Sequence, residues 1–284
     1  MILRKMIVLA CVSFGVFAAE KASASSLRWY IADLKTSFPQ HKQYSSRTAL
    51  TAANYVAVLN GLKNGAKVDG IRVPIFPTEA SPSHYSKTYK DILAYARSIN
   101  LAVYASPMSV GMGDYSGWSS AQYAGWLANY VNFFRPEFLS PFNEPGIDDS
   151  RITDIMKQLR PLLASGTRIL GPDRQHVGST LDDLARNPAV ADLFDIIDAH
   201  SANRDSSATA ANWSALVRSE SKPVWSSENP ANWSAGVDSS LPGIAEAVNS
   251  GVEGLVVWYA KPSLVDDNGR PTEKALEIVE RLGK

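Results

Sequence analysis

Two short stretches decide the fold: Ser-Pro-Phe-Asn-Glu-Pro-Gly at residues 140–146 and Trp-Ser-Ser-Glu-Asn-Pro at residues 225–230. Each is a strand-like run that reaches a glutamate, Glu144 or Glu228, and then breaks at a proline. Because proline cannot continue a hydrogen-bonded central strand, the backbone leaves regular structure at that point. Each stretch therefore predicts a carboxylate at the end of a strand.

Strand-like and helix-like segments alternate around these stretches along the whole chain. Such alternation predicts a parallel sheet covered by helices, and eight pairs predict closure into a single (β/α)8 barrel of the α/β class. A doubly wound open sheet is the alternative. The expected strands are 27–31, 68–76, 101–105, 138–142, 168–170, 194–199, 223–226 and 254–258. The expected helices are 47–64, 85–99, 121–134, 152–163, 180–186, 208–219, 241–249 and 271–282.

Residues 1–24 have the pattern of a signal peptide: two basic residues, an apolar run over 6–19, and Ala-Ser-Ala at 22–24. The apolar run is short for a membrane span, although a retained anchor is the alternative. Residues 25–284 contain no linker or repeat and are predicted to form one domain. We therefore expect a secreted or periplasmic protein that leaves the membrane after signal cleavage, and we expect a monomer.

Composition excludes several classes of function. The chain has 28 basic and 28 acidic residues and no basic run, so its charge gives no reason to expect a nucleic-acid partner. Its one cysteine, Cys11, lies in the signal segment, which excludes disulfides and zinc–thiolate sites from the mature chain. Asp173, His176 and Asp198 do not have the spacing of metal ligands, and solvent-facing roles are expected for them. No metal and no cofactor are predicted.

The two glutamates lie three strand–helix units apart, after the fourth expected strand and at the end of the seventh. All strands of a barrel are parallel, so Glu144 and Glu228 should point into the same C-terminal mouth. Two carboxylates roughly 5 Å apart can cleave a glycosidic bond with retention of configuration. One protonates the departing oxygen, and the other attacks the anomeric carbon.

With these residues, the chain resembles the retaining glycosidases of clan GH-A. These are (β/α)8 barrels whose acid/base glutamate follows an asparagine at strand four and whose nucleophile ends strand seven. Asn143-Glu144-Pro145 matches the first motif, and Ser227-Glu228-Asn229 fits the second. The resemblance implies that Glu144 is the acid/base, Glu228 the nucleophile and Asn143 a substrate-binding residue. It identifies a clan rather than a family.

Three other strand positions fit the clan. Arg72, on the second strand, is implied to hydrogen-bond the nucleophile and keep it ionised, as a guanidinium near a carboxylate does. His200 ends the sixth strand and Trp258 the eighth, and both are implied to bind substrate. The alternatives are a surface arginine, a core histidine and a barrel-filling tryptophan. Many clan members have a tyrosine two residues after the strand-six histidine, where this chain has Ala202, so the closer family stays open.

The sequence thus predicts a secreted retaining glycoside hydrolase with a polysaccharide or oligosaccharide substrate. The expected loops are short, which favours an open groove and an endo-acting β-glycanase. A transglycosylase using the same covalent intermediate is one alternative. A non-catalytic carbohydrate-binding barrel is another, although binding alone requires neither an acid nor a nucleophile.

Overall fold

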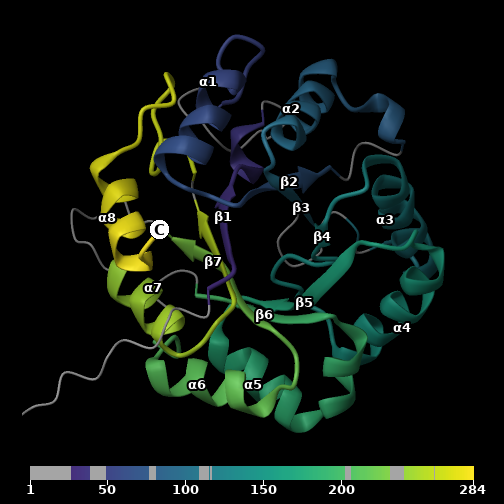
Figure 1. Ribbon diagram of the computed structural model, residues 1–284. Helices are drawn as coiled ribbons and strands as arrows, with labels where there is room; N and C mark the ends of the chain where they lie inside the picture. The colour runs from purple at the N-terminus through teal and green to yellow at the C-terminus, as the bar shows by residue number, and fades with distance from the viewer. Residues whose placement is uncertain are drawn as a thin grey trace, which may run out of the picture.

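A computed structural model describes residues 27–38, 49–76, 81–108, 115, 117–201, 206–230, 240–258 and 260–284. Within these ranges, eight parallel strands pair in chain order, and β8 pairs with β1 to close a barrel. The helices α1 to α8 follow one another in chain order around the strands (Figure 1). The chain is therefore a (β/α)8 barrel, as the alternation predicts, and the open-sheet alternative is wrong. The signal segment 1–24 and Ala202 lie outside the described residues.

The elements have the following bounds. The strands are β1 (Trp29–Asp33), β2 (Gly70–Ile75), β3 (Ala102–Pro107), β4 (Phe138–Leu139), β5 (Arg168–Arg174), β6 (Ile196–His200), β7 (Val224–Pro230) and β8 (Gly254–Trp258). The main helices are α1 (Tyr55–Asn60), α2 (Lys87–Ser98), α3 (Ser120–Phe134), α4 (Asp149–Leu159), α5 (Val177–Arg186), α6 (Ala210–Ser219), α7 (Ser240–Asn249) and α8 (Glu273–Leu282). Shorter helical turns are η1 (Lys35–Ser37), η2 (Gly61–Gly65), η3 (Pro82–His84), η5 (Arg160–Leu162) and η6 (Pro188–Leu193).

The bounds of several strands differ from the sequence prediction, three of them next to the two glutamates and their partners. β7 runs to Pro230 rather than ending at 226, so Glu228 lies within the strand. β4 ends at Leu139 rather than at 142, because Pro141 has no N–H with which to extend the ladder. β5 runs to Arg174 rather than ending at 170, so it continues through Gly171-Pro172, a pair that normally indicates a turn. The structure therefore places Asp173 inside a strand.

The barrel interior is layered. Its lower layer is apolar, and the indole of Trp225 fills so much of it that a side chain at Gly254 would meet the ring at 2.1 Å. Side chains alternate along a strand, so positions two residues further toward the mouth point inward again. Those positions are polar: Asp33 follows Ile31, Ser106 follows Tyr104, Ser140 follows Phe138, Asp198 follows Ile196 and Ser227 follows Trp225. An apolar floor thus supports a buried polar layer just below the mouth. The lower layer consists of Ile31, Tyr104, Phe138, Leu170, Ile196, Trp225 and Val256.

A second apolar layer lies between the strands and the surrounding helices. Helix α4 begins close to the mouth, where the side chain of Asp148 accepts a hydrogen bond from the Arg151 N–H at 2.9 Å and caps the helix. No helix among the described residues is long and apolar enough to cross a membrane.

Candidate active site

The strands bring Glu144 and Glu228 together at the C-terminal mouth. Glu228 belongs to β7, and Glu144 lies in the segment between β4 and α4. One carboxylate oxygen of each glutamate and one ring nitrogen of His200 lie within 4.8 Å of one another. The side chains of Glu144 and Glu228 are 12% and 10% exposed, so both retain access to solvent. This separation is close to that of the carboxylate pair in retaining glycosidases.

Three cations surround the carboxylate of Glu228. Its Oε2 lies 2.8 Å from Arg72 Nη1, 3.7 Å from Lys35 Nζ and 3.8 Å from His200 Nδ1. Burial disfavours the ionised carboxylate, but the charges of His200, Lys35 and Arg72 outweigh it and hold the pKa of Glu228 below its ordinary value. Glu228 is therefore kept as an anion with one face toward solvent.

Arg72 joins the strands beneath the two glutamates. Its side chain is fully buried, and its Nη1 also donates to Asp33 Oδ2 at 3.1 Å. Its Nη2 donates to Ser106 Oγ and to Asn143 Oδ1, both at 3.1 Å. The guanidinium therefore fixes the asparagine that precedes Glu144 as well as Glu228 itself. The alternative of a surface arginine is wrong.

His200 contacts both sides of the site. Its Nδ1 lies 3.0 Å from Glu144 Oε1, and its Nε2 lies 2.7 Å from Asp173 Oδ1, an ionic contact without hydrogen-bond alignment. Burial disfavours the charged ring, but Asp173 and Glu228, together with the contact to Glu144, raise the pKa of His200 to about 10. The ring is therefore an imidazolium at neutral pH, and Nδ1–H donates to Glu144.

This raised pKa predicts a pH-dependent stability. The pKa of His200 is about 10 in the folded protein and near 6.5 in an unfolded chain. The stabilisation is complete below about pH 6.5 and is lost as the pH rises through about 10. We expect the free energy of unfolding of the unsubstituted protein to fall by up to about 5 kcal/mol relative to His200→Gln over this range. Urea denaturation of both proteins at each pH measures this difference in unfolding free energy. A difference that does not change with pH would mean that the His200 ring is neutral in the folded protein.

Asp173 connects the histidine to the rest of the polar layer. Its buried carboxylate accepts from Ser140 Oγ at 2.9 Å and from Ser227 Oγ at 3.0 Å, and it lies 3.5 Å from Arg72 Nη2. Burial opposes ionisation, but His200 and Arg72 hold the pKa of Asp173 below its usual range. Asp198, by contrast, has a pKa raised by burial and by Asp173. Both side chains are fully buried, so the prediction of solvent-facing roles for Asp173 and Asp198 is wrong.

Sequence reasoning missed Lys35. This lysine lies in η1, the turn that follows β1, where its backbone N–H donates to Asp33 Oδ1 at 2.7 Å. Its Nζ donates to Asn143 Oδ1 at 2.6 Å and faces Glu228. Burial and the neighbouring Arg72 lower the pKa of Lys35. The available signal was Asp-Leu-Lys directly after an apolar strand, which places charged residues at a strand end just as the glutamate motifs do.

The backbone at Glu144 is left-handed. Its φ is 49°, and Asp173, the residue that accepts its N–H at 3.0 Å, has a φ of 58°. For a residue with a side chain this conformation costs roughly 1–2 kcal/mol, and it persists only where surrounding contacts impose it. The register of the neighbouring strands is also irregular between Ala199 and His200, and such irregularities redirect side chains near active sites.

Trp258 ends β8, as the sequence predicts, and its backbone is in register with Pro230 of β7. It is half-buried at the mouth end of the barrel. The tyrosine position of the clan, Ala202, lies outside the described residues.

Among the described residues, Glu144, His200 and Glu228 are the one group whose ligand atoms are close enough for a metal ion. Their surroundings oppose a metal. The pKa of His200 keeps its ring protonated, and Arg72 and Lys35 place two further positive charges near Glu228. Divalent metals require a neutral imidazole. The arrangement is suited instead to proton transfer and to attack by an anionic carboxylate.

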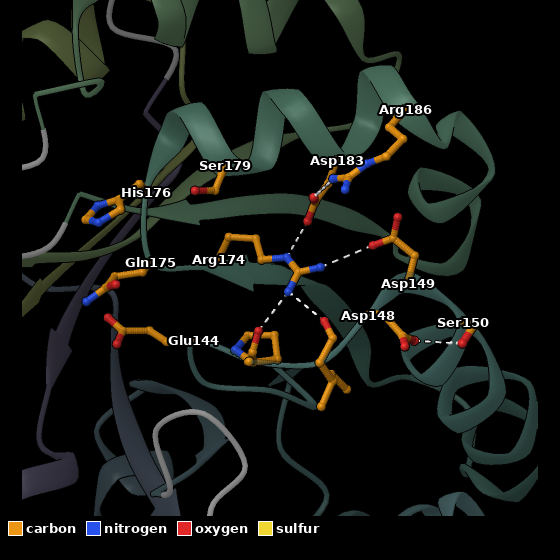
Figure 2. Close-up of a pocket in the computed structure, with 13 residues that line it drawn as sticks. Glu144, Asp148, Asp149, Ser150, Arg174, Gln175, His176, Ser179, Asp183 and Arg186 are labelled. Atoms are coloured by element: carbon orange, nitrogen blue, oxygen red, sulfur yellow. Dashed lines mark hydrogen bonds and ion pairs between the residues drawn. The ribbon is translucent and has the colours of Figure 1, made fainter.

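A polar cavity of about 830 Å³ extends outward from Glu144 (Figure 2). Its walls come from the segment between β4 and α4, from the end of β5 and from α5. In Figure 2 the Glu144 carboxylate lies at one edge, and the Arg174 guanidinium lies in the middle with Asp149 and Asp183 beside it. A group bonded to an oxygen beside Glu144 would therefore have space to continue into this cavity. The lining residues are Glu144, Pro145, Gly146, Ile147, Asp148, Asp149, Ser150, Arg174, Gln175, His176, Ser179, Asp183 and Arg186.

Several solved structures of glycoside hydrolases share this architecture. The xylanase Xyn30A of Clostridium acetobutylicum, of family 30 subfamily 8, has 19% identity over 90% of this chain and 70% of its own, with a TM-score of 0.63. A family 30 endoxylanase from Clostridium papyrosolvens has 16% identity over 93% and 72% of the two chains, with a TM-score of 0.62. A Streptomyces mannanase catalytic domain has 17% identity over 80% and 81%, with a TM-score of 0.57.

At such identities the likeness shows the (β/α)8 fold. Barrels of several glycoside hydrolase families share it, including a family 18 chitinase from Pseudoalteromonas aurantia at 14% identity and a TM-score of 0.58. No protein-family model matches the sequence, and neither does any curated protein.

Proposed function

We propose that this protein is a retaining glycoside hydrolase. The observation that carries the proposal is the pair Glu144 and Glu228, with oxygens within 4.8 Å and with only Glu228 ion-paired to Arg72 and Lys35. An anion held by two cations suits the nucleophile, and a carboxyl at the edge of a cavity suits the acid that protonates the departing oxygen. The resemblance to clan GH-A gives the same two roles.

In the proposed reaction, Glu228 attacks the anomeric carbon while Glu144 donates its proton to the leaving oxygen. Glu144 then takes a proton from water, the water oxygen bonds to the anomeric carbon, and the bond from that carbon to Glu228 breaks, which gives a product of retained configuration. His200 holds Glu144 on one side, and Arg72 and Lys35 hold Asn143 beside it. Asn143 and Trp258 are the proposed substrate contacts. The prediction that His200 contacts substrate is wrong, because its side chain is fully buried and both ring nitrogens face carboxylates.

We propose an endo-acting β-glycanase, because the cavity next to Glu144 lies where the leaving group would continue and is large enough for more than one sugar ring. Its fold neighbours include xylanases and a mannanase, which makes xylan and β-mannan the first substrates to test. The signal pattern at residues 1–24 supports secretion. The same cavity would hold an acceptor sugar, so transglycosylation is the second candidate.

The test is incubation of the purified protein with xylan, β-mannan and chitin, followed by sizing of the products. We expect internal cleavage of the polysaccharide. We also expect the β-anomer to be released first, as monitored by proton NMR. Initial release of the α-anomer would contradict the retaining mechanism. Binding of a glycan without cleavage would leave a carbohydrate-binding barrel, and longer products would identify a transglycosylase.

Lys35 provides a prediction about pH. Lys35→Met removes a positive charge 3.7 Å from Glu228 and keeps the volume of the side chain. The pKa of Glu228 should rise, so the acidic limb of the kcat/KM profile should move upward by about one pH unit. The matched control is Lys87→Met, which removes an exposed lysine paired with Asp91. An acidic limb that stays in place in Lys35→Met would exclude a role for this lysine in the ionisation of Glu228.

A further inference from the structure

The segment that carries Glu144 lies outside the helices and strands. β4 ends at Leu139, and α4 begins only at Asp149. Glu144 has a left-handed backbone, and its N–H is bonded to the carbonyl of Asp173. A carboxyl that donates a proton must be held to within about 0.5 Å. Some further contact must therefore fix the chain immediately after Glu144.

Arg174 makes that contact. It is the last residue of β5, and its Nη1 donates to Pro145 O at 2.7 Å and to Ile147 O at 3.0 Å. These are the carbonyls one and three residues after Glu144. One group thus holds the backbone on the C-terminal side of Glu144.

The guanidinium is itself held from two helices. Its Nη2 lies 3.1 Å from Asp149 Oδ1 in the first turn of α4, and its Nε is ion-paired with Asp183 Oδ2 of α5. The Arg174 side chain is only 13% exposed. A guanidinium presents its N–H groups in a rigid plane, so four contacts in fixed directions define its position. A lysine ammonium could supply the charge but not this set of directions.

We propose that Arg174 is a positioning residue for proton donation by Glu144. By clamping Pro145 and Ile147 to β5, α4 and α5, it maintains the left-handed backbone that aims the Glu144 carboxyl at the leaving oxygen. This inference rests on the proposed function for the role of Glu144. The clamp itself can be tested without any activity.

Arg160 provides a matched control at the other end of the barrel. In η5, after α4, its Nη2 donates to Leu193 O at 2.7 Å and to Asp195 Oδ1 at 3.1 Å. Asp195 immediately precedes β6, so this clamp is of the same kind but lies on the face away from the mouth. Arg160→Met should therefore cost stability without moving Glu144.

The first measurement is amide hydrogen exchange across residues 140–150 in the unsubstituted protein, Arg174→Met and Arg160→Met. Arg174→Met should accelerate exchange of the Glu144 amide, which donates to the Asp173 carbonyl, by at least about tenfold, because local opening of the segment governs that exchange. Arg160→Met should leave this segment unchanged. Equal exchange in the two variants would overturn the clamp, whatever the protein catalyses.

The second measurement compares leaving groups, using phenyl and 2,4-dinitrophenyl β-xylobiosides and β-mannobiosides. Phenolate needs a proton to depart and dinitrophenolate does not. Arg174→Met should therefore lower kcat/KM about 100-fold on the phenyl glycoside and less than about threefold on the dinitrophenyl one. The kcat/KM values of Arg174→Lys should be close to those of Arg174→Met. Arg160→Met should change kcat/KM by the same factor for both substrates.

The outcomes test the positioning role of Arg174 and the proposed function separately. Equal losses on the two leaving groups in Arg174→Met, or full recovery in Arg174→Lys, would overturn the positioning role. Faster exchange in Arg174→Met together with no cleavage of any glycoside by the unsubstituted protein would reject the proposed function and keep the clamp.

Discussion

Replacing Glu228 with glutamine is expected to abolish turnover of every glycoside, with kcat at least about 10⁵-fold lower, as when other covalent nucleophiles are removed. The amide is nearly isosteric but cannot form the glycosyl ester. The quality of the leaving group should make no difference, because attack itself is lost. No covalent adduct should be detectable by mass spectrometry.

Azide provides the diagnostic test for Glu228→Gln. Azide can take the place of the missing carboxylate and attack the anomeric carbon directly, in a single displacement. The product should be a glycosyl azide of inverted configuration, and proton NMR measures that configuration. An azide product of retained configuration, or an adduct on another residue, would remove Glu228 from the nucleophile role.

Replacing Glu144 with glutamine should have an effect that depends on the leaving group. Hydrolysis of a phenyl glycoside or a polysaccharide should fall by about 10²–10⁴-fold, because proton donation to the departing oxygen is lost. Dinitrophenolate departs without a proton, so the first step should survive with that substrate. The second step lacks its base, and a sugar adduct should accumulate on Glu228.

Rapid-quench mass spectrometry would detect the adduct as a burst in Glu144→Gln. Azide needs no deprotonation, so it should restore turnover and give a product of retained configuration, the reverse of the result for Glu228→Gln. If the two variants exchanged these patterns, the roles of Glu144 and Glu228 would be exchanged. If neither formed an adduct with the dinitrophenyl glycoside, the covalent mechanism would be wrong.

The sequence predicts the barrel and the meeting of Glu144 and Glu228 for one shared reason. Alternating strands and helices make a parallel barrel, and parallel strands deliver their ends to one mouth. The contact between Arg72 and the Glu228 carboxylate, implied by the resemblance, is present at 2.8 Å. These features depend on the order of strands and helices and on which residues stand at the strand ends, and both can be read from the sequence.

Other parts of the site depend on contacts between distant residues, which local patterns do not contain. The position of Lys35 just after a strand does not show whether it is buried, and its contacts with Asn143 after β4 and with Glu228 of β7 appear only in the fold. Asp173 follows Gly-Pro, which indicates a turn, yet β5 continues through it. Its role becomes visible only when Ser140, Ser227 and His200 surround it.

The closed apolar floor of the barrel affects how the ionisation of Glu228 depends on salt concentration. The side chains of Arg72, Asp33, Asp173 and His200 are fully buried above that floor, and the Arg72 guanidinium lies 5.2 Å from the centre of the Tyr104 ring. Dissolved ions cannot enter between such charges, so Debye screening reaches them far less than it reaches an exposed pair. The field that keeps Glu228 ionised should therefore be nearly the same in dilute buffer and in brine. For the proposed reaction, the acidic limb of the pH profile should therefore lie at nearly the same pH in low and in high salt.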